Sequence, residues 1–326
     1  MRSFHAVVPL LCFLCSSAVA DLGPYEDRPF GEPSDEQLAR TRLEAWALQY
    51  FAAATLPLAF GPAKSMEPGS LAVDLELADI PRLDKAERTI GFSNTRSSIT
   101  PSPQNLNTVP VLFRPSLRVG LPANFDLSVS VLPPTDVFEA RPQLYSLALD
   151  HTLWESERFR VGWRAFAQYG RVDGSFVCDD HAVAAPAFSQ SNPYGCLDTS
   201  HDTVRFWNLG AQLSIALKLH ELGGIEPYLG VNVHYQDLLF KTDNRNQVTE
   251  IVTGDSLDRR ELYGDFWNWG LTGGLRWPFA ERHTLSVGVS YQPLDVRRPD
   301  TGEIFTEVAE EDDSLIQARI QYSFAL

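Results

Sequence analysis

The chain ends in the stretch Ser-Leu-Ile-Gln-Ala-Arg-Ile-Gln-Tyr-Ser-Phe-Ala-Leu (residues 314–326), in which apolar and polar residues alternate. The apolar side carries Ile316, Ala318, Ile320, Tyr322, Phe324 and Leu326, and the polar side carries Gln317, Arg319, Gln321 and Ser323. This period of two predicts a β-strand with one apolar and one polar face. Its aromatic residues gather near the end, where a strand that crosses a lipid bilayer needs an interfacial anchor.

Earlier segments repeat the alternation, so the chain is predicted to be all-β, with about ten antiparallel strands. These segments cover residues 71–77, 109–119, 125–131, 145–153, 159–169, 207–219, 229–235, 267–279 and 285–291. A soluble β-sandwich alternates in the same way, because it also has one buried and one solvated face. Two further patterns distinguish a sandwich from an up-and-down transmembrane barrel.

The first pattern is the length of the links between strands. Long or polar links cover roughly residues 82–107, 133–142, 171–202, 238–258 and 297–313. They alternate strictly with links of a few residues, such as Pro122-Ala123-Asn124 and Glu155-Ser156-Glu157. Membrane barrels place long loops at one end and short turns at the other, whereas a sandwich has no reason to do so.

The second pattern is the position of aromatic residues. Phe159 and Tyr169 stand at opposite ends of one outward face, and Trp267 and Phe279 do the same in a later strand. Tilted strands of about 9 to 11 residues cross the apolar layer of a bilayer, and aromatic residues collect at its two borders. Both patterns therefore favour a closed barrel in a membrane.

With these features, the C-terminal strand resembles the closing strand and C-terminal signal of bacterial outer-membrane β-barrels. It departs from them in that Ala325 and Leu326 follow Phe324, where such signals usually end on Phe. The resemblance implies a porin-like protein of the Gram-negative outer membrane that contacts its lipid and is inserted by the barrel-assembly machinery through this strand. It implies an architecture and no particular activity.

A second resemblance concerns layout alone. From Ala52 to Asp79, an Ala-rich helix end leads through Met66-Glu67-Pro68-Gly69 into the first strand. This is similar to outer-membrane transporters of fatty acids and aromatic compounds, whose N-terminal segment plugs the lumen. Those proteins are longer and have more strands, and the likeness suggests a hydrophobic substrate.

Three regions follow along the chain. Residues 1–20 have a basic start, an apolar middle and an Ala-Val-Ala end, which predicts a secretory signal peptide. Residues 21–69 are predicted to be helical, with Ser34 and Gln37 forming a capping box and the helix ending near Pro57. The helix lies either in the periplasm or partly inside the barrel mouth, or it is a plain linker. Its apolar stripe consists of Leu43, Trp46, Ala47, Tyr50, Phe51 and Ala54. Residues 70–326 form the barrel.

The inward faces carry most of the charge that we expect to line the lumen. The predicted lining residues are Arg114, Arg118, Arg160, Arg164, His234, Arg276, Arg319, Asp74, Glu76, Asp126 and Asp150. A small barrel has little interior room and unpaired charges there are costly, so these side chains should form ion pairs and hydrogen bonds. They either close the lumen or leave a narrow passage in which inward Arg favours anionic or polar solutes.

The remaining residues limit the chemistry. Cys178 and Cys196 lie in one long link and predict a disulfide in an exported protein. The acidic run from Glu303 to Asp313 is typical of a solvated loop and matches no dedicated Ca²⁺ spacing, so we expect no metal or cofactor. A net charge of −15, from 27 basic and 42 acidic residues, argues against a nucleic-acid partner.

A hydrolase is the least favoured function, because Ser and His must lie within hydrogen-bonding reach. His234 and Ser290 are predicted on strands that another strand separates, so no residue is assigned a catalytic role and no enzyme is expected. The sequence favours a narrow or plugged passive channel or transporter for small solutes. The alternative is a structural or surface-interaction barrel whose outer loops bind a partner.

Overall fold

The computed structural model describes residues 35–37, 43–81, 111–134, 140–189, 191–192, 194–298 and 311–326. All of these belong to one compact unit, Gly31–Leu326. The predicted signal peptide, Ser34 and most of the acidic run lie outside the described residues. Within the described part, no helix is both long and apolar enough to cross a membrane.

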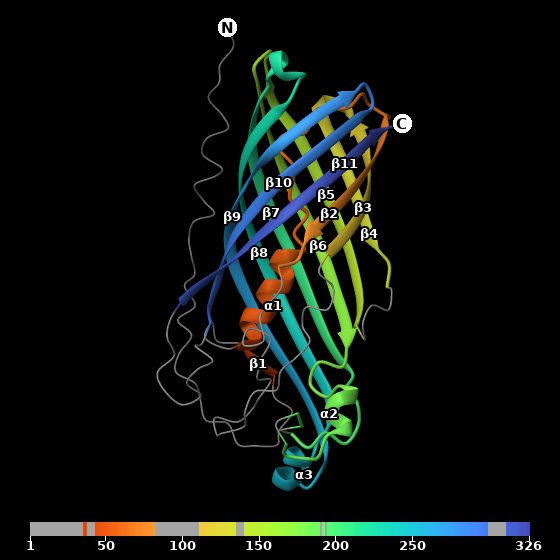
Figure 1. Ribbon diagram of the computed structural model, residues 1–326, viewed down its shortest axis with the longest axis vertical. Helices are drawn as coiled ribbons and strands as arrows, with labels where there is room; N and C mark the ends of the chain where they lie inside the picture. Colours follow the sequence, from red (N-terminus) through yellow and green to blue (C-terminus); the bar gives the residue numbers. More distant parts are fainter. Residues whose placement is uncertain are drawn as a thin grey trace. The chain divides into compact units, whose positions relative to one another are not determined.

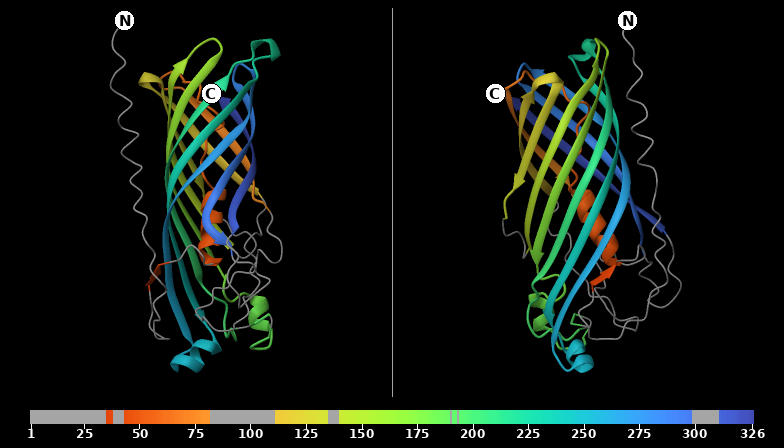
Figure 2. Two further views of the ribbon diagram at one scale, coloured as in Figure 1. Left: turned by 90° about the vertical axis from the view of Figure 1, so that its left-hand side faces the viewer. Right: turned by 180° about the vertical axis from the view of Figure 1, so that it is seen from behind.

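Strands β2 to β11 form a closed antiparallel barrel (Figures 1 and 2). They are β2 (Leu71–Asp79), β3 (Val111–Leu121), β4 (Phe125–Leu132), β5 (Ala140–Glu155), β6 (Phe159–Gly174), β7 (Asp202–Leu217), β8 (Glu226–Arg245), β9 (Leu257–Ala280), β10 (His283–Arg298) and β11 (Glu311–Ala325). Each strand pairs with the next, and β11 pairs back onto β2 with Arg319 opposite Ala78. The predicted ten-strand, up-and-down barrel is confirmed.

The apolar faces of the strands point out of the barrel. Leu213, Val231 and Val289 are 50 %, 46 % and 52 % exposed, whereas the two sheets of a sandwich would bury such side chains in its centre. In the C-terminal strand, Ile316 is exposed while Gln317 is buried, as the alternation predicts. A continuous apolar exterior of this kind requires lipid, because water-soluble proteins do not expose one.

Two belts of aromatic side chains border this apolar exterior. At the outer border, ring contacts join Tyr145 to Tyr169, Tyr169 to Trp207, Tyr235 to Trp267 and Trp269 to Tyr291. At the other border, near the short turns and the C-terminus, ring contacts link Phe125, His151 and Trp163, and also Trp277, Phe279, His283 and Phe324. The belts mark the two bilayer interfaces, and the end with the short turns faces the periplasm.

Several strands continue beyond the outer belt, which corrects one predicted loop. The stretch 238–258 is not a single loop, because β8 runs to Arg245 and β9 begins at Leu257, with α3 (Gln247–Thr253) between them. Leu238, Phe240 and Leu262 are buried in an apolar cluster, which stabilises the extended hairpin. The stretch 171–202 likewise contains strand ends and α2 (Asp180–Ala184), while η2 (Pro122–Asn124) and η3 (His220–Leu222) form short turns.

The predicted helix start is wrong. Gln37 lies in a short strand, β1 (Asp35–Gln37), and α1 (Leu43–Ala54) begins later and ends before Pro57. β1 pairs in parallel with Glu261–Tyr263 of β9. This edge of β9 accepts a strand because β10 pairs with β9 only as far as Tyr291, opposite Leu271. Tertiary pairing therefore overrides the local capping signal.

We predict that Leu213→Arg lowers the free energy of unfolding by roughly 2–4 kcal/mol, because it places a charge on the lipid face between the two belts. Ile251→Arg, on the exposed surface of α3, is the matched control and should change stability little. Denaturant unfolding of both variants in lipid vesicles measures the difference. Equal stability of the two variants would contradict a membrane-facing Leu213.

Candidate functional site

The lumen contains a segment of the chain itself. Residues 48–69, here called the plug segment, comprise most of α1 and the extended chain that leads to β2 at the periplasmic end, and Figures 1 and 2 show α1 within the ring of strands. Wall side chains donate to its carbonyls: Arg114 to Leu56 (3.1 Å), Arg164 to Pro57 (3.0 Å), Arg319 to Leu58 (3.2 Å), Arg276 to Pro62 (3.1 Å) and Thr152 to Ala63 (2.9 Å). The donors come from all round the barrel, so the segment runs along its interior.

The plug segment is also bonded through its backbone N–H groups. Gln212 makes two bonds with Ala59: its Oε1 accepts from the Ala59 N–H at 2.7 Å, and its Nε2 donates to the Ala59 carbonyl at 3.1 Å. Further along, the Met66 N–H donates to Asp126 Oδ1 at 3.2 Å. The wall thus supplies the partners that this irregular backbone needs when it is buried.

The structure places the predicted lumen residues on the interior, where the charged ones are close to one another. The ion pairs are Arg118–Asp74 (3.1 Å), Arg114–Glu76 (3.2 Å), Arg319–Glu76, Arg164–Asp150 (2.8 Å), Arg160–Glu226 (2.9 Å) and Arg276–Glu226 (3.9 Å). Each described lumen Arg therefore has a carboxylate neighbour. The arrangement pairs the charges inside the barrel and leaves none of these guanidinium groups without a carboxylate beside it.

The interior changes character along the barrel. Charged pairs occupy the periplasmic half, and uncharged amides follow towards the outer side. The amides missing from the predicted lumen set are Gln168, Asn208, Gln212, Asn232, Gln236, Asn268, Gln292 and Gln317, and all of them are buried. The same period-two alternation places them inward.

The outer end of the lumen is apolar, which differs from the expectation of polar side chains throughout. A cluster there joins α1 to the wall and to the outer loops. It includes Leu48, Tyr50, Leu112, Leu144, Phe206, Leu238, Phe240, Leu262, Phe266, Leu294 and Leu315. This cluster packs the outer side of the plug segment against apolar side chains of the wall.

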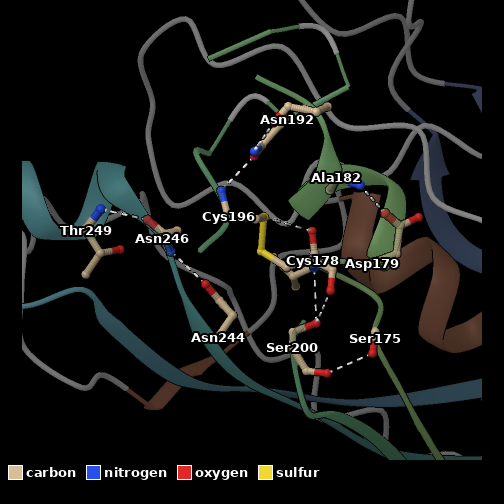
Figure 3. Close-up of a disulfide and its surroundings, with 12 residues drawn as sticks. Ser175, Cys178, Asp179, Ala182, Asn192, Cys196, Ser200, Asn244, Asn246 and Thr249 are labelled. Carbon is tan, nitrogen blue, oxygen red and sulfur yellow. Dashed lines mark hydrogen bonds between the residues drawn. A yellow bond between two sulfur atoms is a disulfide. The ribbon is translucent and has the colours of Figure 1, made fainter. Parts of the chain in front are cut away.

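A folded cap, which consists of the described residues of 175–201 and 246–256 and includes α2 and α3, packs against this cluster. It contains the predicted disulfide, which is confirmed. Cys178 and Cys196 are bridged, and both are buried (Figure 3). The Cys178 N–H donates to Ser200 Oγ at 3.1 Å and the Cys196 N–H donates to Asn192 Oδ1 at 2.7 Å. Closing a loop of this size contributes roughly 3 kcal/mol by restricting the unfolded chain.

Asp202 supports the cap from the first residue of β7, outside the outer aromatic belt. Its carboxylate accepts from Ser200 Oγ at 2.6 Å, from the Val177 N–H at 2.8 Å and from the Asp243 N–H at 3.2 Å. Burial raises the pKa of the Asp202 carboxyl to about 6, and the hydrogen bonds oppose that shift only in part.

His234 is fully buried on β8, and its Nδ1 lies 3.1 Å from Asn232 Oδ1. Ser290 is on β10, and β9 lies between these two strands. The described residues contain no group of three or more His, Cys, Asp or Glu side chains that could hold a metal ion.

The closed ten-strand barrel, its apolar exterior with two aromatic belts and the segment of its own chain inside define an outer-membrane β-barrel protein. The protein is located in the bacterial outer membrane.

Comparison with known proteins finds only distant likenesses. No protein-family model and no curated protein matches the chain. Among solved structures, the outer membrane protease OmpT from Escherichia coli is 8 % identical and matches 79 % of this chain and 94 % of its own, with a TM-score of 0.37. The Pseudomonas putida toluene transporter TodX is 11 % identical over 79 % and 90 %, with a TM-score of 0.32. Neisserial surface protein A is 8 % identical over 79 % and 95 %, with a TM-score of 0.27. At these values, none of the likenesses bears on activity.

We predict that Arg164→Met destabilises the barrel by roughly 3–5 kcal/mol, because it leaves the buried Asp150 carboxylate without its bidentate partner. The double variant Arg164→Met/Asp150→Leu should lose less than the single variant, since no unpaired charge remains. Urea unfolding of the refolded proteins gives both values. A double variant that loses as much as the sum of the single changes would contradict the pairing.

The raised pKa of Asp202 predicts that the cap gains stability as the pH falls from 7 to 5. The folded state binds the proton at a higher pH than the unfolded state, whose pKa is near 4, so acidification favours folding across this interval. The ¹³C NMR shift of the Asp202 carboxyl should titrate with a midpoint near 6, and Asp202→Asn should remove the pH dependence of amide protection in the cap. A midpoint near 4 would contradict the prediction.

Proposed function

We propose that the protein is a plugged passive channel for small solutes, and that the plug segment is the part that moves. The observation that carries this proposal is the hydrogen-bonded boundary between the wall and residues 55–69. A barrel of this size can fill its lumen with its own inward side chains and needs no separate segment for mechanical closure. A separate segment that contacts the wall through hydrogen bonds can instead be displaced.

The polar boundary favours displacement, because water and polar solutes can replace each hydrogen bond that is lost. A neutral hydrogen bond contributes a net of about 0.5–1.5 kcal/mol and one to a charged group about 1.5–3 kcal/mol. Local shifts of the plug segment therefore cost little free energy, whereas release of the whole segment costs much more. The channel is accordingly narrow and opens rarely.

We propose no preference for anions, although the sequence contains an excess of inward Arg. Each of Arg114, Arg164 and Arg319 already contacts a carboxylate and a plug carbonyl among the described residues. An anion would have to displace both partners. Small uncharged solutes fit the paired interior better.

The second candidate function is a surface-interaction barrel whose cap binds a partner. The disulfide holds the cap in one conformation, which reduces the entropy cost of binding. Phe188, Leu197 and Ile251 are exposed on it and offer apolar contacts. In this case the plug segment would serve stability alone.

Single-channel recording in planar bilayers tests the proposal. The wild type should show rare, small conductance steps, and Gln212→Leu should raise their frequency roughly tenfold or more, because two hydrogen bonds of about 1 kcal/mol each to Ala59 are lost. Leu213→Ala, on the outer face of the same strand, is the control and should behave as the wild type. The absence of steps above background in all three proteins would reject the channel and favour the surface-interaction barrel.

A further inference from the structure

A group of uncharged polar side chains lies between the charged pairs and the apolar cluster of the lumen. We call it the amide–histidine cluster, and it consists of Asn208 on β7, Asn232, His234 and Gln236 on β8, and Gln292 on β10. All five are at most 2 % exposed. Asn208 is opposite Gln236, so the strands bring these side chains to one patch of the inner wall.

Each member of the cluster has a buried polar atom without a hydrogen-bond partner among the described residues. These atoms are Asn208 Oδ1, Asn232 Nδ2, His234 Nε2, Gln236 Nε2, and Gln292 Oε1 and Nε2. An unpaired buried donor or acceptor costs about 1–3 kcal/mol, so native proteins keep few of them. A concentration of unpaired atoms in one patch indicates a missing partner.

The cluster offers both donors and acceptors and carries no charge. The Nδ1 of His234 contacts Asn232 Oδ1, which can only accept, so Nδ1 carries the proton and Nε2 is an acceptor in the neutral ring. The unpaired donors are therefore Asn232 Nδ2, Gln236 Nε2 and Gln292 Nε2. The unpaired acceptors are His234 Nε2, Asn208 Oδ1 and Gln292 Oε1.

The plug segment leaves this patch unsatisfied for a structural reason. Next to the cluster the segment is the helix α1, whose carbonyls mostly bond within the helix, whereas farther along it is extended and its carbonyls face the wall. Two contacts between described residues of α1 and the wall lie beside the unpaired atoms without involving them: Ala52 O accepts from Asn208 Nδ2 at 3.3 Å, and Gln49 Oε1 accepts from Asn268 Nδ2 at 3.3 Å.

Glycines on the wall bring the cluster together. An added Cβ at Gly270 would lie 2.2 Å from Gln292 Oε1, and one at Gly210 would lie 2.7 Å from His234 Cβ. Only glycine allows these side chains to lie so close to the backbone of the neighbouring strand.

We propose that the amide–histidine cluster is a binding site for a small, uncharged, polyhydroxylated solute. A hydroxyl group both donates and accepts, and several of them match the mixed set of unpaired atoms. The site contains no charge to hold an ion. This proposal rests on the proposed function. It adds the class of solute and the place in the lumen where the solute binds.

Saturation-transfer NMR with erythritol tests the site on the full-length mature protein refolded in detergent. Erythritol protons should receive saturation from the wild type. Asn232→Leu and Gln292→Leu should each weaken the signal at least about fivefold, since a hydrogen bond of about 1 kcal/mol is lost. Gln321→Leu, which removes an amide on β11 outside the cluster, should retain the signal. Heat-modifiable migration on a gel verifies that every variant is folded.

Three outcomes would overturn the site: no transfer to erythritol from the wild type, equal transfer from the wild type and both cluster variants, or stronger transfer to methylphosphonate used as a charged probe. The first would mean that ordered water alone occupies the cluster. Conductance separates this test from that of the channel. Erythritol binding without conductance steps would retain the site and reject the channel, whereas steps without binding would reject the site alone.

Discussion

The structure depends on one constraint: the backbone of an extended segment inside a narrow barrel must find hydrogen-bond partners away from bulk water. After α1, the plug segment forms no helix or strand, and few of its N–H and C=O groups bond to other backbone groups. Inward Arg, Gln and Thr side chains supply the donors, and Gln212 and Asp126 supply acceptors. The polar faces of the wall strands therefore stabilise the plug segment as well as line the lumen.

The same constraint explains why the interior is arranged in zones. Where the plug segment is extended, guanidinium groups pair with carboxylates and also bond its carbonyls, as Arg164 does with Asp150 and Pro57. Where it is helical, the backbone satisfies itself, and wall amides are left with unpaired atoms. At the outer end, α1 packs through apolar side chains, and the disulfide-braced cap covers them. The plug segment is thus held by packing on the outer side and by hydrogen bonds on the periplasmic side.

Much of this architecture could be predicted from the sequence because a strand has a strict period of two. Alternation gave the ten strands, their outward faces and the inward position of residues such as Arg114 and Asp150. The extension of β8 and β9 could not be predicted in the same way. Leu238 and Phe240 face inward beyond the membrane, and the polar residues that follow them are typical of a loop. β1 was missed because only the vacant edge of β9 makes those residues a strand.

The candidate site was less predictable, since its partners are far apart in the chain. The Arg319–Glu76 pair depends on the register in which β11, the last barrel strand, pairs with β2, the first. Alternation of apolar and polar residues does not specify that register. Plug carbonyls carry no sequence signal, because every residue has one. The unpaired amides likewise became visible only once α1 had a position.

Intramolecular crosslinking tests most directly whether the plug segment lies in the lumen. With Ala59→Cys and Gln212→Cys in one chain, mild oxidation should form a crosslink that speeds migration of the unfolded, non-reduced protein, because the two residues are hydrogen-bonded across 153 positions. With Ala59→Cys and Leu213→Cys, whose side chain faces lipid, no crosslink should form. A crosslink at Leu213, or equal lack of one at both positions, would contradict a plug segment held inside the barrel.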